Sequence, residues 1–489
     1  MRGSRGEIGA LRALETRLRK YAAAVSLLAV VAGAVPMRAQ EAPVAGASPA
    51  LSPEQKMAKL AGRATGRVIY RGATLINGAG AGAANERLAA DMSIVVDGEM
   101  IKAIAPWSAL DKSLTGGAEV VDARGLFATP GLIDSHVHYA TQPQRAIAEA
   151  ELKRDVYGGL TGVRDMAGDA RALADLARAA LINEIPAPDI FYSALVAGPS
   201  FFEDPRTLSS SLGLRSGQVP WLYAVTGDSE LPLVVAQARG TGATGLKIYA
   251  NLPGPLVRAL IAEAKRQHFP VWTHQQVYPA TPYDSLGATS VSHVCMIARF
   301  IREPGKSSYG RGNEPSYDGL SADEPGIAHY IAALAKSGTI MDATLSVYFP
   351  PAAADGKGAV SKRCPLALAG DITRKMFDAG VPIAAGTDAG AGPDNPYPAL
   401  YAEMEALVRN AGLTPAQAII AATRNGAAAL EKQGEFGTLE PGKYANLAFF
   451  KDNPALDIAN LRSVVLTVKR GTRFWRKDYH HQPIPDEPD

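Results

Sequence analysis

From about residue 125 onward, the chain alternates short apolar runs with longer segments in which apolar residues recur every three or four positions. The short runs predict buried strands, and the recurrence at three and four predicts amphipathic helices. Helical segments of this kind cover 173–183, 256–267 and 327–337. Strands that alternate with helices are typical of a parallel sheet built from strand–helix units.

Eight apolar runs follow one another in this part of the chain. They lie at or near 129–138, 160–168, 190–198, 245–250, 270–275, 290–294, 339–348 and 382–390. Eight strand–helix units predict a TIM barrel, in which the catalytic groups gather at the carboxyl ends of the strands. The polar, glycine- and proline-rich segments 302–321 and 350–363 follow the sixth and seventh runs, so we expect them to be lids over the site.

The pattern changes on both sides of the predicted barrel. Residues 68–120 and 439–475 show short alternating strands that are separated by the turns NGAG, DGEM, EPGK and KRGT. Each piece is too small to bury a core alone, so we expect the two to pair. The predicted fold is therefore α/β: a (β/α)8 barrel over 125–434, a small β-sandwich domain from 66–124 and 435–478, and a polar tail over 479–489.

The first forty residues differ from the rest of the chain. Basic residues precede an apolar run over 21–35, which contains small residues near its end. This layout predicts a signal peptide over 1–40, followed by a linker over 41–65. The apolar run is shorter than the roughly 20 residues that cross a bilayer. We expect an exported protein, periplasmic or secreted, that leaves the membrane after signal removal; a buried amphipathic helix is the alternative interpretation.

Composition narrows the class of partner. Charged residues make up 20% of the 489 residues, and the formal net charge is +2, so no broad field favours nucleic acid. The expected partner is a small molecule, and a homo-oligomer is compatible with the sequence. Only Cys295 and Cys364 are present. A single disulfide remains an alternative, but the apolar strand-end context of Cys295 favours a buried free thiol.

Half of the eight histidines fall at the ends of predicted strands. His136 and His138 end the first run, and strand alternation sends positions two apart to the same face. His274 ends the fifth run, His293 the sixth and Asp388 the eighth. Because the carboxyl ends of barrel strands meet at one mouth, we expect these side chains to converge there as metal ligands.

Lys247 ends the fourth run, among apolar neighbours. An inward lysine at this depth must be neutralised or find an anionic partner. Carbamylation by carbon dioxide is one solution, because it converts the amine into a carboxylate-like group that can bridge two cations. The alternative is a lysine whose charged end reaches the rim of the barrel.

The motifs GLIDSHVH, LKIY, WTHQ, SHV and GTDAG, in this order, resemble the binuclear branch of the amidohydrolase superfamily. The resemblance extends over nearly the whole chain after the predicted signal. The flanking VVDARGLFATPGLID and GTLEPGKYANLAFF resemble the pieces that build the small β-domain of these enzymes. The closest similarity is to prolidase-like and imidazolonepropionase-like members, and Lys247 favours the binuclear metallodipeptidase type over the mononuclear imidazolonepropionases.

The resemblance implies a ligand set and a mechanism. It implies that His136, His138 and Asp388 bind the more buried of two divalent ions, that His274 and His293 bind the other, and that carbamylated Lys247 bridges them. Zinc is the expected metal, and iron, manganese, cobalt or nickel also suit such ligands. A metal-bridging hydroxide would attack the substrate carbonyl, and Asp388 would move the proton to the leaving group. The expected activity is hydrolysis of an amide or peptide-like C–N bond.

Specificity is less well defined by the sequence. Prolidase-like relatives usually carry a second His or Tyr two residues after the strand-five histidine, where this chain has Gln276, and a neutral amide there weakens the case for a carboxylate-bearing dipeptide substrate. Predicted substrate contacts at the mouth are Tyr139, Arg164, Tyr249, Gln276, Tyr278 and Tyr348. Arg164 has the alternative role of bracing the barrel.

Three other functions are alternatives to this interpretation. Hydrolysis of an ester or lactone fits the same residues equally well. A mononuclear deaminase requires a glutamate shortly after the strand-five histidine, which THQQ does not supply. A non-catalytic scaffold would typically have lost ligands, and none of the six is missing.

Overall fold

The computed structural model describes residues 62–78, 88–141, 143–275, 277–306, 315–349 and 363–481. The predicted signal peptide and most of the linker lie outside the described residues, as do 307–314 and 350–362 of the two predicted lids. The described residues all belong to one compact unit. Among the described helices, none is long and apolar enough to cross a membrane.

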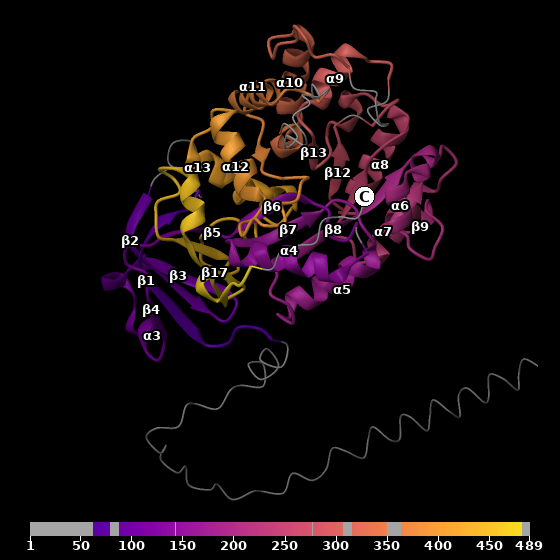
Figure 1. Cartoon of the computed structure of the whole chain (residues 1–489). Helices are drawn as coiled ribbons and strands as arrows, with labels where there is room; N and C mark the ends of the chain where they lie inside the picture. The colour runs from indigo at the N-terminus through magenta and orange to yellow at the C-terminus, as the bar shows by residue number, and fades with distance from the viewer. Residues whose placement is uncertain are drawn as a thin grey trace, which may run out of the picture. The chain divides into compact units, whose positions relative to one another are not determined.

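Eight parallel strands form the predicted barrel (Figure 1). In order around the sheet they are β6 (Leu132–Val137), β7 (Leu160–Asp165), β8 (Asp189–Ala197), β11 (Gly245–Ile248), β12 (Val271–His274), β13 (Ser290–Ser292), β14 (Ile340–Asp342) and β15 (Ile383–Ala384). The amide of Ser135 donates to the carbonyl of Ala385 at 2.9 Å, which brings the last strand against the first. The TIM-barrel prediction is confirmed.

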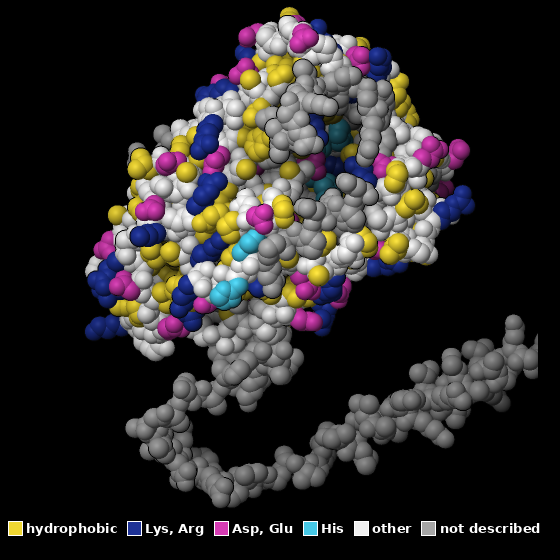
Figure 2. Space-filling view, in the orientation of Figure 1, with side chains coloured by type: hydrophobic (Ala, Val, Ile, Leu, Met, Phe, Trp, Pro, Cys, Tyr) yellow, Lys and Arg dark blue, Asp and Glu magenta, His cyan; other side chains and the backbone are white. Residues whose placement is uncertain are grey.

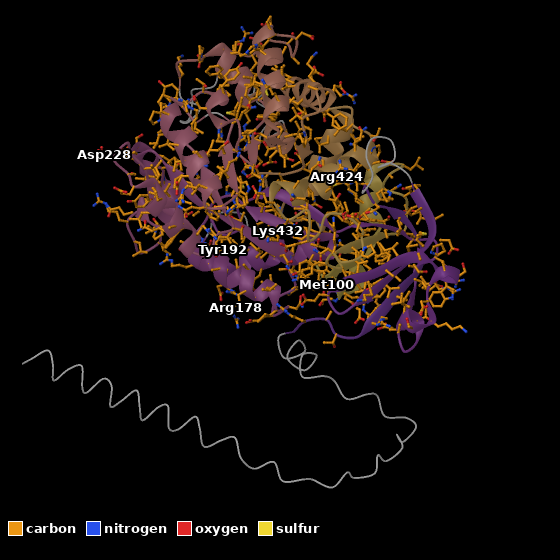
Figure 3. The ribbon with its side chains drawn as sticks, turned by 180° about the vertical axis from the view of Figure 1, so that it is seen from behind. Met100, Arg178, Tyr192, Asp228, Arg424 and Lys432 are labelled. Carbon is orange, nitrogen blue, oxygen red and sulfur yellow. A yellow bond between two sulfur atoms is a disulfide. The ribbon has the colours of Figure 1, made fainter. Side chains whose placement is uncertain are left out.

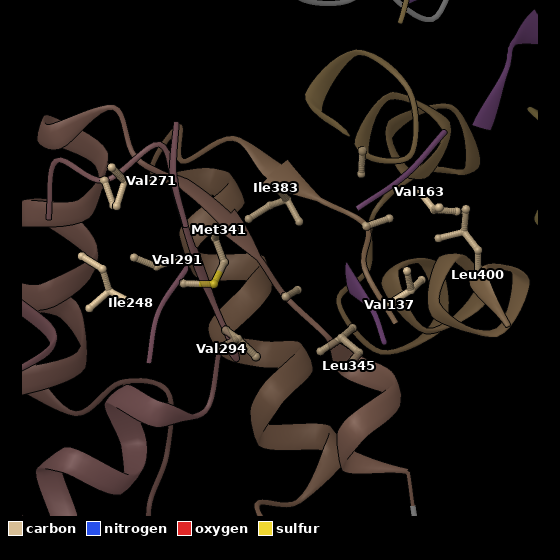
Figure 4. Close-up of a cluster of buried hydrophobic side chains, with 14 of the residues drawn as sticks. Val137, Val163, Ile248, Val271, Val291, Val294, Met341, Leu345, Ile383 and Leu400 are labelled. Carbon is tan, nitrogen blue, oxygen red and sulfur yellow. The ribbon is translucent and has the colours of Figure 1, made fainter. Parts of the chain in front are cut away.

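Helices surround the strands and cover their outward side chains. They are α4 (Arg145–Tyr157), α5 (Ala170–Leu181), α7 (Leu231–Gly240), α8 (Gly254–Arg266), α9 (Met296–Arg302), α10 (Pro325–Ser337), α11 (Leu366–Asp378), α12 (Leu400–Arg409), α13 (Pro415–Ala421) and α14 (Arg424–Ala429). In α8 the buried side chains include Val257, Leu260 and Ala264, at the spacing expected for one helix face. Strand residues such as Val291 and Met341 belong to the same apolar core (Figure 4).

The small domain is built from both ends of the described chain. Its strands are β1 (Arg67–Ile76), β2 (Leu88–Asp97), β3 (Met100–Pro106), β4 (Glu119–Asp122), β5 (Phe127–Pro130), β16 (Leu447–Phe450), β17 (Val464–Lys469) and β18 (Thr472–Trp475). β5 pairs with both β1 and β16, and hydrogen bonds join all eight strands into one mixed sheet rather than two separate ones. Met100, which is labelled in the rear view of Figure 3, forms a further antiparallel β-bridge with Tyr444.

Short elements complete the described chain. They are η2 (Trp107–Ala109), α3 (Lys112–Thr115), η3 (Pro199–Glu203), α6 (Pro205–Ser209), β9 (Gln218–Val219), β10 (Leu222–Ala224), η4 (Pro282–Ser285), η5 (Leu345–Tyr348), η6 (Ile458–Ser463) and η7 (Arg476–Asp478). The seventh apolar run, at or near 339–348, predicts a strand. Its strand β14 ends at Asp342, and the run continues as the 3-10 turn η5.

Cys295 and Cys364 form a disulfide, so the predicted free thiol is wrong. Cys295 follows the end of β13, and Cys364 precedes α11. The sequence separation of 69 residues hides their proximity, whereas the fold brings their Cα atoms to 6.4 Å, a usual distance for a disulfide. The bond joins two segments on the side of the barrel that carries the predicted ligands.

Candidate active site

The predicted ligands from the first, sixth and eighth strands converge at the mouth of the barrel. Oδ1 of Asp388 lies 3.1 Å from Nε2 of His138 and 3.6 Å from Nε2 of His136, and Oδ2 lies 3.7 Å from Nδ1 of His293. The His274 ring lies 4.6 Å from the His293 ring, centroid to centroid. Ligand atoms of His136, His293 and Asp388 lie within 4.8 Å of one another, close enough to hold one metal ion.

The backbone at two of these residues adopts an uncommon conformation. His293 has a φ of 74° and Asp388 a φ of 47°, both in the left-handed region. A non-glycine residue held there costs about 1–3 kcal/mol, and such residues cluster at functional sites. His293 directly follows β13, and Asp388 lies in the segment that follows β15, after Gly386 and Thr387.

A glycine allows the eighth strand to pass close to the first. A Cβ on Gly386 would lie 2.3 Å from Oδ1 of Asp342 and 2.8 Å from Cβ of His136. Only a glycine fits this approach without displacing its neighbours. The next residue, Thr387, is held by Asp134, which accepts hydrogen bonds from its amide at 3.0 Å and its hydroxyl at 2.9 Å.

Three of the histidines have their Nδ1 atoms occupied by protein groups. Nδ1 of His136 donates to Asp342 Oδ2 at 2.8 Å, and Nδ1 of His138 donates to the carbonyl of Ala167 at 3.2 Å. Nδ1 of His293 bonds to the Thr344 hydroxyl at 2.9 Å. Metal-binding histidines typically use one ring nitrogen in this way, which fixes the ring and leaves Nε2 for the ion.

Burial adjusts the charge of these rings. Removal from water lowers the pKa of His136, and it lowers the pKa of His293 to well below its ordinary value. Burial therefore favours the neutral form of both rings, which is the form that coordinates a metal ion. For Asp388, burial alone would raise the pKa, but the electrostatic interaction with His136 and the hydrogen bond from His138 lower it to well below its ordinary value.

Lys247 reaches the site from β11 and has a buried amine. Its side chain is 2% exposed, and its Nζ has no hydrogen-bond partner among the described residues. Burial, with repulsion from Arg164 as the next contribution, lowers the pKa of Lys247 to about 7. A neutral amine is the form that reacts with carbon dioxide, and an unpartnered buried nitrogen is costly as it stands. The alternative in which the charged end reaches the rim is therefore wrong.

Arg164 does not line the mouth, and the predicted substrate contact is wrong. The side chain is fully buried, and its guanidinium donates to the Ser135 carbonyl at 2.5 Å, to Ser290 Oγ at 2.7 Å and to Asp342 Oδ2 at 3.2 Å. It also stacks on Trp272, 5.0 Å from the ring centre. These contacts link β6, β7, β12, β13 and β14, which is the bracing role given above as the alternative.

The other predicted substrate contacts divide into three groups. Tyr249 and Tyr348 border a cavity at the site. The hydroxyl of Tyr139 donates to Asp155 of α4, so its polar end is bound within the protein rather than at the mouth. Gln276 lies outside the described residues, and Tyr278 is not among the residues that border the cavity.

Sequence reasoning missed the residues that hold the ligands. Asp342 and Thr344 orient His136 and His293 as described above. Glu403 of α12 is fully buried, and its carboxylate accepts from the amides of Leu345 and Ser346 at 2.9 and 2.7 Å and from the Ser346 hydroxyl at 2.7 Å. It thereby fixes η5, which follows Thr344. An acidic residue inside the apolar seventh run was the available signal for Asp342. The sequence around Glu403 offered no such signal.

The cavity beside Asp388 has a volume of about 370 Å³. Besides His274, His293 and Asp388, its border is formed by Tyr249, Met296, Tyr317, Ser346, Val347, Tyr348, Arg363, Cys364 and Ala389. The surface view shows histidine, acidic and basic side chains together in one hollow (Figure 2). The size and the mixture of apolar walls with a few polar groups are typical of small-molecule sites.

Comparison with known sequences gives the family of the C-terminal part and several relatives. Residues 364–473 match the model of the amidohydrolase family. A segment of 77 residues is 43% identical to an imidazolonepropionase of Geobacillus kaustophilus (strain HTA426), covering 16% of this chain and 18% of that protein. A longer match, 24% identical over 392 residues, covers 76% of this chain and 88% of an imidazolonepropionase of Solibacter usitatus (strain Ellin6076).

Several solved structures match the fold of this chain over most of its length. A Xaa-Pro dipeptidase with bound methionine matches with a TM-score of 0.63 and 21% identity, over 84% of this chain and 100% of that one. An ochratoxinase from A. niger matches with a TM-score of 0.65 and 20% identity, over 84% of this chain and 96% of that one. At this identity the structural likeness shows the fold alone. The family match over 364–473 and the longer sequence match support an assignment to the amidohydrolase superfamily.

Proposed function

We propose that this protein is a metal-dependent hydrolase that cleaves an amide or peptide-like C–N bond of a small molecule. The observation that carries the proposal is the convergence of His136, His138, His293 and Asp388 at the barrel mouth, with His274 against His293. The names of the relatives, imidazolonepropionase and Xaa-Pro dipeptidase, support the same class of reaction.

The residues fit a centre for two divalent ions, with zinc as the expected metal. Imidazole and carboxylate are ligands that zinc prefers, and Nδ1 of His136 and of His138 is already bound to protein, which leaves Nε2 for an ion. The unpartnered, buried Nζ of Lys247 fits a carbamate that would bridge the two ions. Conversion of the amine to a carbamate would also remove the free-energy cost of burying Lys247 Nζ without a hydrogen-bond partner.

The bound ions and Asp388 have different roles in the proposed reaction. Bound divalent ions lower the pKa of water and polarise the substrate carbonyl. Asp388, whose Oδ1 lies 3.1 Å from Nε2 of His138, accepts the proton of the attacking nucleophile and delivers it to the leaving nitrogen. The left-handed backbone at Asp388 directs this carboxylate into the cavity.

Metal analysis combined with a substrate screen tests the proposal. The purified protein should contain divalent metal, lose activity on chelation and regain it with zinc. It should hydrolyse members of a panel of N-acyl amino acids, dipeptides and lactones. His138→Ala should lose metal and activity, whereas His329→Ala, at an exposed position of α10, should keep both. A metal-free protein, or turnover of lactones alone, would contradict the proposed C–N hydrolase.

We also propose that the protein acts outside the cytoplasm. The predicted signal peptide motivates the proposal, and the Cys295–Cys364 disulfide supports it because disulfides persist in oxidising compartments. Cell fractionation after expression of the full chain tests it: recovery of the protein in the cytoplasm with residues 1–40 uncleaved would refute it.

A further inference from the structure

The cavity beside Asp388 has one basic side chain on its border. Among the border residues that the structure describes, Arg363 is the sole arginine or lysine. Its neighbours on the border include the side chains of Met296, Val347 and Tyr348. The cavity therefore combines a catalytic carboxylate, an apolar and aromatic wall, and one permanent cation.

Contacts of the protein hold Arg363 near the catalytic groups. Its guanidinium donates to the carbonyl of Val347 at 3.2 Å, so it lies against η5. The next residue, Cys364, is bonded to Cys295, which stands two residues after His293. The start of α11 is thus covalently joined to the strand end that carries a predicted metal ligand.

The turn that receives the guanidinium is itself fixed. Glu403 binds the amides of Leu345 and Ser346, and the Tyr348 hydroxyl accepts a hydrogen bond from the amide of Cys295 at 3.2 Å. Arg363 is therefore attached at its backbone by the disulfide and at its side chain by a turn with its own buried anchors. This pre-organisation lowers the entropy cost of binding a ligand.

We propose that Arg363 determines specificity by binding a carboxylate of the substrate, so that the substrates are N-acyl amino acids or dipeptides with a free carboxylate on the leaving side. This inference rests on the proposed function. The planar guanidinium matches a carboxylate through paired hydrogen bonds. The apolar wall accommodates the side chain of the amino acid, and a cavity of about 370 Å³ suits a molecule of this size.

A single guanidinium favours a carboxylate over a phosphate. A phosphate group carries more charge and is usually held by several cations or by a helix N-terminus. Gln276 is a neutral amide and supplies no positive charge for a carboxylate. Arg363 supplies the positive charge from another loop, after the seventh strand.

The experiment compares each N-acyl amino acid with its carboxamide, which has nearly the same shape and no charge. The wild type should favour the acid by roughly 10- to 100-fold in kcat/KM. Arg363→Gln should lose this preference through a higher KM for the acid, with kcat and the carboxamide rate unchanged. Arg363→Lys should be intermediate, because it keeps the charge and loses the paired geometry. Arg374→Gln, at a partly exposed arginine of α11 outside the cavity border, is the control and should behave as the wild type.

Calorimetric binding separates this inference from the proposed function. If the wild type hydrolyses no member of the panel, the proposed function fails, and the affinities of N-acetyl-leucine and N-acetyl-leucinamide decide the inference. The inference is supported if the wild type and Arg374→Gln bind the acid more tightly than the carboxamide and Arg363→Gln does not. The inference is overturned if Arg363→Gln prefers the acid over the carboxamide as strongly as the wild type does, either in kcat/KM or in calorimetric binding.

Discussion

Asp342 accepts a hydrogen bond from Nδ1 of His136 at 2.8 Å, and both side chains are buried. The same carboxylate oxygen lies 3.2 Å from the guanidinium of Arg164 and 3.0 Å from the hydroxyl of Ser292. One carboxylate on β14 therefore orients a predicted metal ligand on β6 and neutralises a buried arginine on β7. The stability of the barrel and the geometry of the site depend on the same group.

Replacement of this carboxylate should affect both properties. Asp342→Asn leaves Arg164 buried without its counter-charge, so we expect a loss of about 3–5 kcal/mol in the free energy of unfolding, measured in urea. Metal affinity, measured by competition with a chelator, should fall about 10- to 100-fold. Adding Arg164→Met should restore part of the stability and none of the metal affinity. Recovery of both would show that Asp342 acts on the fold alone.

Asp388→Asn should abolish turnover and leave the fold intact. The amide cannot accept the proton, and the contribution of a positioned general acid/base is at least roughly 100-fold. Circular dichroism and the unfolding temperature should match those of the wild type. Activity within about tenfold of the parent would rule out Asp388 as the proton carrier.

Carbamylation of Lys247 predicts a dependence on carbon dioxide. The metal-free protein should recover activity with zinc only when bicarbonate is present, because the neutral amine must first react. In Lys247→Glu a carboxylate is already in place, so any recovery should be independent of bicarbonate. Recovery of the wild type in rigorously carbon dioxide-free buffer would refute the carbamate.

The hydroxyl of Thr344 should be required for tight metal binding. Thr344→Val keeps the shape and removes the partner of His293 Nδ1, so the affinity for metal should fall by about tenfold or more. Thr344→Ser restores the hydroxyl and should restore the affinity. A cobalt-substituted protein reports the change in ligand geometry through its visible spectrum. Identical spectra and affinities in Val and Ser variants would contradict this role.

Glu403 should make stability depend on pH. Burial raises the pKa of this carboxyl from 4.5 to about 8, although three hydrogen bonds from η5 oppose the shift. Since the folded pKa is above the unfolded one, its contribution is fully present below pH 4.5 and is lost as pH rises toward 8. The unfolding free energy of Glu403→Gln should therefore fall less steeply than that of the wild type over this interval. Parallel curves from urea titrations would refute the shift.

Local patterns in the sequence were sufficient to predict the barrel and the convergence of most of the predicted ligands at its mouth. The alternation of apolar runs with helical spacing reports the burial of each element, and the barrel follows from eight such units. His136 and His138 could be assigned because alternation along one strand decides the face of both residues. His274, His293 and Asp388 could be placed because all barrel strands end at the same mouth.

The tertiary structure decided the groups that hold the ligands and shape the cavity. Asp342 meets His136 across 206 residues, Glu403 meets Ser346 across 57, and Cys295 meets Cys364 across 69. A periodic pattern shows that a side chain is buried without identifying its partner. Arg164 illustrates the difference: the sequence left open whether it contacts the substrate or braces the barrel, and only its contacts with neighbouring strands show that it braces the barrel.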